Sequence, residues 1–435
     1  MRNIIQSTKN HSSPLYILGA GSIGLLHASC MRVVKNNNYT SSLPTYVLLR
    51  SRHKDKLIPT SSFRNRSIVF PSKVANDKIN NSLLELQPLP LWNSNSNRNR
   101  YDDEFIIAAF KDIHNEMRLL DLPAKIIDDI QVSSIDRNQN DNYIQNILLC
   151  TKAPDAVKAL ESIIHLLHPT EQIHIVIMTN GSMGVVSDIK SMINGHGLLK
   201  DRIDLIYAST THGAHRGSLE DFEDINVITK HKTFNIHHAG LGYTYLENTT
   251  AFSYILSDIW NEIGLRVNLV STQEMNIMNW KKLATNCAIN ALTALRRCSN
   301  GALLDSYSAK DNIVTIDELD HHGHEWNYND PLIFYQLIRE VSDVAIADAE
   351  TKGQTEIRQH FQYENLVYFV KEVVSNTSNN KSSMLQDILH QRYPTEIQYL
   401  NGYIVDKGHK LGINVTANEL LCHEVETLTK DFKLN

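Results

Sequence analysis

LYILGAGSIG, residues 15–24, is the stretch that sets the fold of the N-terminal half. Its apolar residues 15–18 predict a short buried strand, and the apolar spacing of residues 23–31 predicts a helix after the glycines. The pattern GxGxxG also occurs in ordinary glycine turns. Between a strand and a helix it favours dinucleotide binding, because amides at a helix N-terminus can hold a diphosphate. We therefore expect a cofactor loop formed by Gly19, Ala20, Gly21, Ser22, Ile23 and Gly24.

The next apolar run, residues 46–49, ends at a basic segment. An enzyme that uses NAD typically places Asp or Glu there, where it binds the ribose 2′-hydroxyl. This chain instead has Arg50, Arg52 and Lys54, and no acid between residues 46 and 54. A solvated basic loop would have the same composition. We interpret the cations as ligands of a 2′-phosphate, with Arg50 foremost, and expect NADPH as the cofactor.

Short apolar runs continue at residues 147–149, 173–178 and 203–208, with a helical pattern at 155–167 between the first two. Such alternation predicts an α/β fold of the Rossmann type, a doubly wound parallel sheet that binds ligands at the carboxyl ends of its strands. Residues 60–143 interrupt the alternation with an irregular pattern, which we interpret as an insertion that is mostly loop.

After residue 273 the sequence changes to long helical periodicities. They cover residues 274–297, 331–352, 363–375, 395–410 and 416–430. We predict a Rossmann domain over residues 1–270 and an all-helical domain over 271–435, with a second insertion at about 306–329. Capping-box spacing, in Thr395 with Gln398 and in Thr416 with Glu419, predicts the starts of the last two helices.

The composition is that of an ordinary globular protein, with 42% hydrophobic and 21% charged residues. A net charge of −6 gives no overall basic surface for nucleic acid, and five cysteines without a CxxC pair argue against a zinc ribbon or disulfide framework. No apolar run approaches the roughly 18 residues of a membrane span. Residues 1–13 carry Arg2 and Lys9 and no acid, as a mitochondrial presequence would. The first strand follows so soon that we expect a cytoplasmic protein.

The helix predicted at 274–297 has polar side chains on an otherwise apolar face. Lys282, Asn286 and Asn290 are four residues apart, so they share one side of the helix. Burying an amide without a hydrogen bond costs about 1–3 kcal/mol, so this face requires either a structural network or a polar substrate. On spacing alone, Lys282 could equally be an exposed lysine like Lys281.

Two blocks of the C-terminal half form a specific pair. WKKLATNCAINALTAL at 280–295 is followed by Asn300-Gly301, and SSMLQD at 382–387 is followed by PTEI at 394–397 and Asn401-Gly402. In this order the blocks resemble the signatures of ketopantoate reductases, the 2-dehydropantoate 2-reductases. Further matches are the glycine loop, TKA at 151–153, Asn180-Gly181, the turn at 210–217 and HAG at 238–240.

The resemblance implies an NADPH-dependent reduction of 2-dehydropantoate to pantoate, a step toward coenzyme A, and a helical domain of the 6-phosphogluconate dehydrogenase-like type. Lys282 would be the general acid that protonates the substrate carbonyl oxygen, and Glu396 would orient this lysine. Glu396 would stay ionised, because a helix N-terminus favours its charge. The implied substrate ligands are Asn286, Asn290, Asn380 and Ser383. The implied cofactor ligands beyond the glycine loop are Arg50, Lys152 and Asn180.

The chain departs from the family pattern at four places. Ser182 adds one residue to the Asn-Gly-Met-Gly turn, and one extra residue lies between Asp387 and Glu396. Both insertions touch the expected cleft, where a displacement of about 1 Å can cost a hundredfold in rate. Ala291 and Thr416 stand where the family usually or often has proline, and neither bears chemistry.

The spacing of the histidines at 321, 322 and 324 does not match any standard metal site. We therefore interpret them as part of a polar loop and expect no metal.

Three functions remain open at this point. The chain could reduce 2-dehydropantoate, reduce another bulky 2-oxo acid, or be a non-catalytic descendant that keeps the fold for binding or regulation. Retention of the polar face at Lys282 argues against the last. Homodimers occur in the family, and we expect a small-molecule partner, with no nucleic acid and no membrane.

Overall fold

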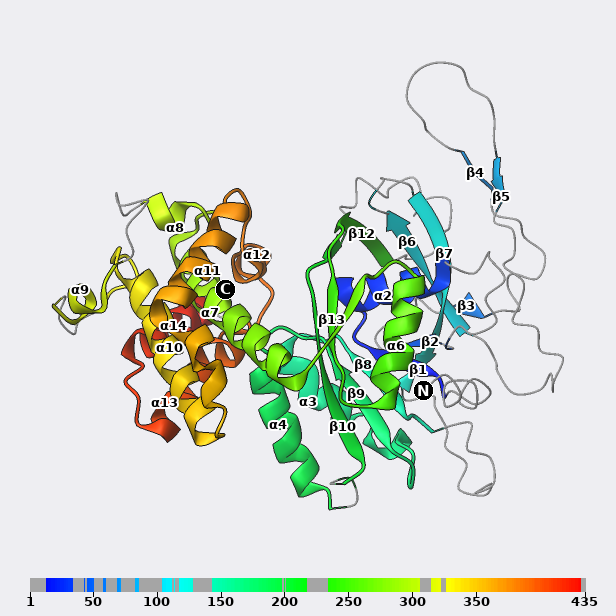
Figure 1. The fold of residues 1–435 in the computed structure, drawn as a ribbon. Helices are drawn as coiled ribbons and strands as arrows, with labels where there is room; N and C mark the ends of the chain where they lie inside the picture. Colours follow the sequence, from blue (N-terminus) through cyan, green and yellow to red (C-terminus); the bar gives the residue numbers. More distant parts are fainter. Residues whose placement is uncertain are drawn as a thin grey trace.

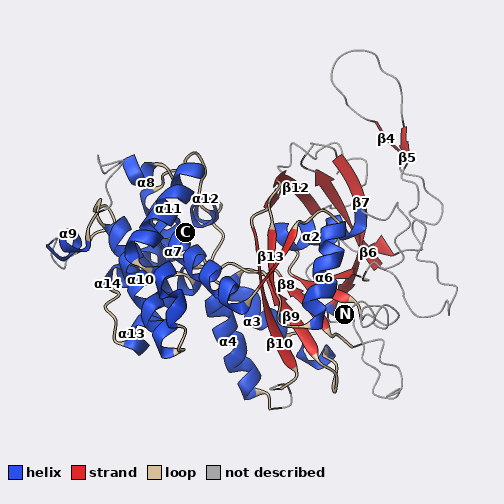
Figure 2. Ribbon diagram, in the orientation of Figure 1, coloured by secondary structure: helices blue, strands red, loops and turns tan. Residues whose placement is uncertain are grey.

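The computed structural model describes residues 13–33, 43, 45–50, 58–59, 69–71, 83–85, 104–111, 113, 117–127, 143–197, 199, 201–216, 234–305, 314–321 and 326–431. Within these residues the strands lie in one half of the molecule, and the other half is made of helices (Figures 1 and 2). Residues 306–313 and 322–325, half of the expected second insertion, lie outside the described residues.

The strands are β1 (Leu15–Leu18), β2 (Thr45–Leu49), β3 (Ile58–Pro59), β4 (Val69–Pro71), β5 (Leu83–Glu85), β6 (Glu104–Lys111), β7 (Met117–Ile126), β8 (Asn146–Leu149), β9 (Ile173–Ile177), β10 (Ile203–Thr210), β11 (Gly213–Arg216), β12 (Phe234–Gly240), β13 (Thr244–Glu247) and β14 (Val267–Val270).

The helices among them are α2 (Ser22–Val33), α3 (Ala153–Glu161), α4 (Ser182–Gly195) and α6 (Ala251–Glu262), and those that follow are α7 (Thr272–Arg296), α8 (Ala302–Asp305), α9 (Ile316–His321), α10 (Ile333–Thr351), α11 (Tyr363–Asn376), α12 (Ser383–Leu389), α13 (Asn401–Leu411) and α14 (Thr416–Asp431). Three short 3-10 helices are η6 (Ile164–Leu166), η8 (Thr355–Phe361) and η9 (Ile397–Tyr399).

The centre of the sheet is a parallel array in the order β7-β2-β1-β8-β9-β10. This is the doubly wound order, in which the chain builds outward from β1 to β7 and then returns to β8 on the other side of β1. The carboxyl ends of β1 and β8 therefore flank the switch point, where such sheets bind ligands. The predicted Rossmann-type sheet followed by a helical region is confirmed.

Two long strands occupy the stretch that the sequence analysis interpreted as mostly loop. β7 pairs in parallel with β2 and supplies the third strand of the array, and β6 pairs with β7 in the antiparallel sense. The interpretation of residues 60–143 as mostly loop was therefore wrong for these two strands. The polar tract at 93–100 lies outside the described residues.

Helix starts were predicted with mixed success. α14 begins at Thr416 as expected, but the helix expected from Thr395 does not form there. Residues 397–399 make a 3-10 turn, Leu400 adopts a non-helical backbone, and α13 begins at Asn401. The capping box was wrong because Gln398 donates its amide to another helix, at Glu426, instead of turning back to residue 395.

The helical half packs around α7, whose central residues are fully buried. A capping box that the sequence analysis missed fixes its start: Ser271 and Glu274 each accept from the other's backbone amide. Farther along α7, the Cys287 carbonyl accepts a hydrogen bond from the buried Asn401 amide at 3.1 Å. This hydrogen bond joins the middle of α7 to the start of α13.

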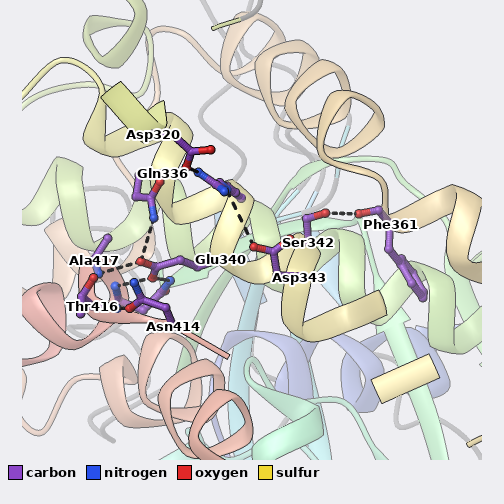
Figure 3. Close-up of polar contacts among 11 residues, drawn as sticks. Asp320, Gln336, Glu340, Ser342, Asp343, Phe361, Asn414, Thr416 and Ala417 are labelled. Atoms are coloured by element: carbon purple, nitrogen blue, oxygen red, sulfur yellow. Dashed lines mark hydrogen bonds and ion pairs between the residues drawn. The ribbon is translucent and has the colours of Figure 1, made fainter. Parts of the chain in front are cut away.

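A buried carboxylate, Glu340 of α10, caps α14 from outside that helix (Figure 3). Its two oxygens accept hydrogen bonds from the backbone amides of Ala417 and Asn418, both at 2.9 Å. The side-chain amides of Asn418 and Gln336 donate to it as well, at 2.7 and 3.1 Å. These bonds satisfy helix N-terminal amides that have no partner within their own helix.

Replacing Glu340 by glutamine is expected to lower the free energy of unfolding by about 3 kcal/mol, because an amide NH₂ would face donors in a buried site. Urea denaturation measures this change. The matched control is Asp343→Asn on the same helix, whose side chain is 48% exposed and 3.9 Å from Arg339. Its effect should stay under about 1 kcal/mol. Equal losses in the two variants would refute the capping role of Glu340.

Candidate active site

The glycine loop lies against the end of β8, as the switch point requires. Gly19 has φ +118°, and a Cβ there would lie 2.7 Å from the Cys150 carbonyl carbon. A Cβ on Gly24 would lie 2.2 Å from the Gly19 carbonyl oxygen. A Cβ on Gly21 would lie 3.7 Å from the Cys150 carbonyl oxygen, an ordinary van der Waals contact. The protein itself therefore leaves room in front of Gly21, and the loop fits a diphosphate that approaches the backbone closely.

Arg216 of β11 also contacts this loop, and the sequence analysis missed it as a site residue. Its guanidinium donates to the Ala20 carbonyl at 2.6 Å and lies over the Phe234 ring. The contact places a cation beside the expected position of the diphosphate.

Arg50 directly follows β2 and is exposed. One guanidinium nitrogen lies 3.8 Å from the Asp155 carboxylate, in the first turn of α3. Arg52 and Lys54 lie outside the described residues. Arg50 thus lies at the strand end where a ribose 2′-substituent is read in this fold, with its guanidinium accessible to a ligand.

Lys282 extends from α7 to the carboxyl end of β10. Its ammonium donates to the Ser209 hydroxyl at 3.1 Å. Burial lowers the pKa of Lys282 below the ordinary lysine range, and the nearby charge of Glu396 opposes this shift. Ser209 was missed by the sequence analysis, although its position at a strand end was a usable signal.

Glu396 is 8% exposed and precedes η9. One carboxylate oxygen accepts from the Ala153 amide at 3.3 Å, and the other accepts from the Asn180 side chain at 3.2 Å. Burial raises the pKa of Glu396, while these two bonds and the Lys152 charge pull it down. No α-helix begins at Glu396, so the helix dipole expected from the sequence does not act on it, and desolvation is the largest effect on its pKa.

Lys152 occupies the position just before α3 and forms an ion pair with Asp387 of α12. Asp387 was quoted in the family signature but was given no role. Residues 152 and 153 thus contact two acids of the helical half, Asp387 and Glu396. Together with the Asn180 contact to Glu396, these contacts join the sheet half and the helical half of the molecule.

The expected substrate ligands lie on α7, at the start of α12 and just before α12. Asn290 is buried on α7, and Thr293 on the same helix donates to Ser382, the N-cap of α12, at 2.7 Å. Because Ser382 takes the capping role, the exposed Ser383 beside it keeps its hydroxyl available. Asn286, Asn290, Asn380 and Ser383 make no side-chain hydrogen bond to one another among the described residues, so the substrate-binding role of all four stays a prediction.

The extra residue Ser182 is taken up at the first position of α4. Gly181 before it has φ +63°, and a Cβ there would lie 2.7 Å from the Tyr399 side chain. Only glycine allows this close approach of the turn to η9. Asn180 keeps its contact with Glu396 despite the longer turn.

Within the described part of the chain, no three His, Cys, Asp or Glu side chains are grouped as a metal site would require. His321 bonds to the Asp317 carbonyl on its own helix, and His322 and His324 lie outside the described residues.

Comparison with known proteins identifies the family. The family model described as ketopantoate reductase PanE/ApbA matches residues 15–250, and its C-terminal counterpart matches residues 274–316 and 331–429. The chain belongs to the ketopantoate reductase family. It is an oxidoreductase, and the family uses pyridine nucleotides.

A curated relative, the 2-dehydropantoate 2-reductase of Vibrio cholerae, is 29% identical over 302 residues, which are 68% of this chain and 82% of the relative. The solved PanE/ApbA family ketopantoate reductase of Ralstonia eutropha matches with a TM-score of 0.56 at 16% identity, covering 96% of this chain and 99% of that one. A D-mandelate dehydrogenase, solved with NADH and anilino(oxo)acetate, matches with a TM-score of 0.58 at 15% identity over 97% and 99% of the two chains.

A dimeric ketopantoate reductase from Staphylococcus aureus has the same fold, with a TM-score of 0.56 at 12% identity over 96% of this chain and 99% of that one. Among the helices that the structure describes, none combines the length and apolar character needed to cross a bilayer.

Proposed function

We propose that the protein reduces 2-dehydropantoate to pantoate with NADPH. The observation that carries this proposal is the position of Lys282, a partly buried ammonium at the carboxyl end of β10, close enough to Glu396 for their charges to interact. The nicotinamide supplies the hydride when it is bound. The chain's own residues supply the proton, the electrostatic environment and the placement of the substrate.

Lys282 provides both a proton and a positive charge to the substrate carbonyl oxygen. Negative charge builds on that oxygen as the ketone is reduced, and a partly buried ammonium stabilises this charge more than a fully solvated one because less water screens it. Its lowered pKa makes the proton easier to give up near neutral pH. Ser209 holds the ammonium at the strand end until the substrate carbonyl replaces it.

Glu396 fixes the other side of the site. Its bonds to the Ala153 amide and to Asn180 hold the carboxylate in the cleft and keep its charge near Lys282. A carboxylate at this position also accepts a hydrogen bond from a substrate hydroxyl, which 2-dehydropantoate carries and a simple 2-oxo acid lacks. Ser383, Asn290, Asn286 and Asn380 are the proposed ligands for the remaining polar groups of the substrate.

Steady-state NADPH oxidation with 2-dehydropantoate tests the substrate. We expect kcat/KM for 2-dehydropantoate to exceed that for phenylglyoxylate by at least about 10²-fold, since a site built around a substrate hydroxyl discriminates against analogues without one. The reverse preference would support the second candidate, a reductase of bulky aryl 2-oxo acids, which the fold match to D-mandelate dehydrogenase favours. Binding of NADPH without turnover of either acid would leave the non-catalytic alternative.

Arg50 is the proposed ligand of the NADPH 2′-phosphate. Replacing Arg50 by alanine is expected to weaken NADPH binding about 10–100-fold, because a charged hydrogen bond contributes about 1.5–3 kcal/mol, and to leave NADH binding nearly unchanged. Fluorescence titration with each cofactor measures both affinities. Arg358→Ala, which removes an equally exposed arginine paired with Glu350, is the control. A parallel loss of NADPH and NADH affinity in Arg50→Ala would refute the assignment.

We further propose a cytoplasmic homodimer, on the basis of the family membership and the dimeric relative. Sedimentation of the purified chain tests the oligomeric state.

A further inference from the structure

Asp387 is a buried acid whose charge must be balanced from the opposite half of the molecule. Its side chain is 10% exposed, and its partner Lys152 is 41% exposed. The lysine could be solvated without the pair, whereas the carboxylate could not, because removing an ion from water is costly unless a partner replaces the water. The need to balance the buried Asp387 charge therefore holds the Lys152 ammonium beside Asp387.

Lys152 lies where the sheet binds ligands. It follows β8 by three residues and directly precedes α3, beside the carboxyl ends of β1 and β8. A free lysine side chain samples many rotamers and loses about 2 kcal/mol of entropy when a ligand fixes it. Held by Asp387, the ammonium is already ordered at the mouth of the cofactor crevice.

The same pair acts on Glu396. The Lys152 charge lowers the pKa of Glu396 and the Asp387 charge raises it. Lys152, Asp387 and Glu396 therefore form one charge cluster, in which the position of the lysine affects both the crevice and the acid of the cleft.

We propose that Asp387 is a positioning residue that acts through Lys152, holding its ammonium in place for a nicotinamide nucleotide bound at the switch point. This rests on the cofactor binding assigned under the proposed function. It assigns no direct contact between Asp387 and substrate or cofactor.

A double-mutant cycle tests this inference. The affinity of the full-length protein for NADPH and for NADH is measured by fluorescence titration in the wild type, Asp387→Asn, Lys152→Met and the double variant. We expect each single substitution to weaken binding of the tighter cofactor by about tenfold, and the double variant to bind no more weakly than Lys152→Met. Asp387→Glu, which keeps the charge, should restore affinity to within about threefold of the wild type.

Asp320→Asn is the matched control, since it removes an acid from an exposed ion pair with Arg339, away from the cleft. Unchanged affinity in Asp387→Asn, or losses that multiply in the double variant, would overturn the inference. A wild type that binds neither cofactor would instead contradict the proposed function.

The pH dependence of kcat/KM provides a readout that a merely structural role would not move. Asp387→Asn removes a negative charge that raises the pKa of Glu396. The acid limb of the kcat/KM profile should therefore shift to lower pH. Lys152→Met removes a positive charge, so the limb should shift to higher pH. Shifts in the same direction would also overturn the inference.

Discussion

Replacing Lys282 by alanine is expected to lower kcat by about 10³-fold or more, because general acid catalysis contributes about 10²–10⁴-fold and the lost electrostatic stabilisation adds to it. The affinity for NADPH should change little. Lys281→Ala is the matched control: the neighbouring lysine lies on the same helix, but its ammonium lies over the Phe369 ring, 5.2 Å from the ring centroid. Retention of activity in Lys282→Ala, or an equal loss in Lys281→Ala, would contradict the assignment.

The pH profile of the wild type adds a second expectation for Lys282. Lys282 must be protonated in the free enzyme to act as the general acid, so kcat/KM should fall as pH rises through the pKa of Lys282. Since burial lowers that pKa, the fall should occur at a lower pH than an ordinary lysine would give. The residual activity of Lys282→Ala should lack this alkaline limb.

Two glycine substitutions are expected to have different effects, one on stability and the other on NADPH affinity. Gly24→Ala places a methyl group 2.2 Å from the Gly19 carbonyl oxygen, so the loop cannot keep its shape and the melting temperature should drop. We expect a loss of about 3 kcal/mol or more, as for other severe overpacking. Gly21→Ala meets no such neighbour and should fold normally, yet its methyl group occupies the space left for the diphosphate, so NADPH affinity should fall at least about tenfold.

Calorimetry and cofactor titration on the same two preparations separate these effects. A stable Gly24→Ala variant would show that the loop is not as tightly packed as the structure indicates. A Gly21→Ala variant with normal NADPH affinity would place the diphosphate elsewhere.

Local sequence signals predicted the parts of the fold that depend on local chemistry. The apolar runs located β1, β2 and β8, and the helical periodicity at 363–375 and 416–430 located α11 and α14 to within about one residue. β7 was not predicted because Pro123 lies within its sequence, and a proline weakens the pattern that indicates a strand. Its place in the sheet is decided by pairing with β2, about 70 residues earlier, which no local window contains.

The site was predictable where residues share one element. Four-residue spacing put Lys282, Asn286 and Asn290 on one face of α7, and the family resemblance supplied Glu396. The partners of these residues come from far along the chain: Ser209 lies 73 residues from Lys282, and Asp387 lies 235 residues from Lys152. Burial is the largest effect on the pKa of Glu396 and raises it. The extent of burial depends on how the whole molecule packs, so local sequence does not reveal it.

Transfer of deuterium from NADPH to the substrate tests the central claim most directly. The wild type is incubated with 2-dehydropantoate in two reactions, each containing one C4-deuterated epimer of NADPH. The mass of the pantoate formed is then measured by mass spectrometry. We expect one epimer to give pantoate with a single deuterium at C2 and the other to give none, because a bound nicotinamide presents one face to the ketone. Bound NADPH with no pantoate formed, or pantoate without deuterium from either epimer, would contradict hydride transfer to this ketone.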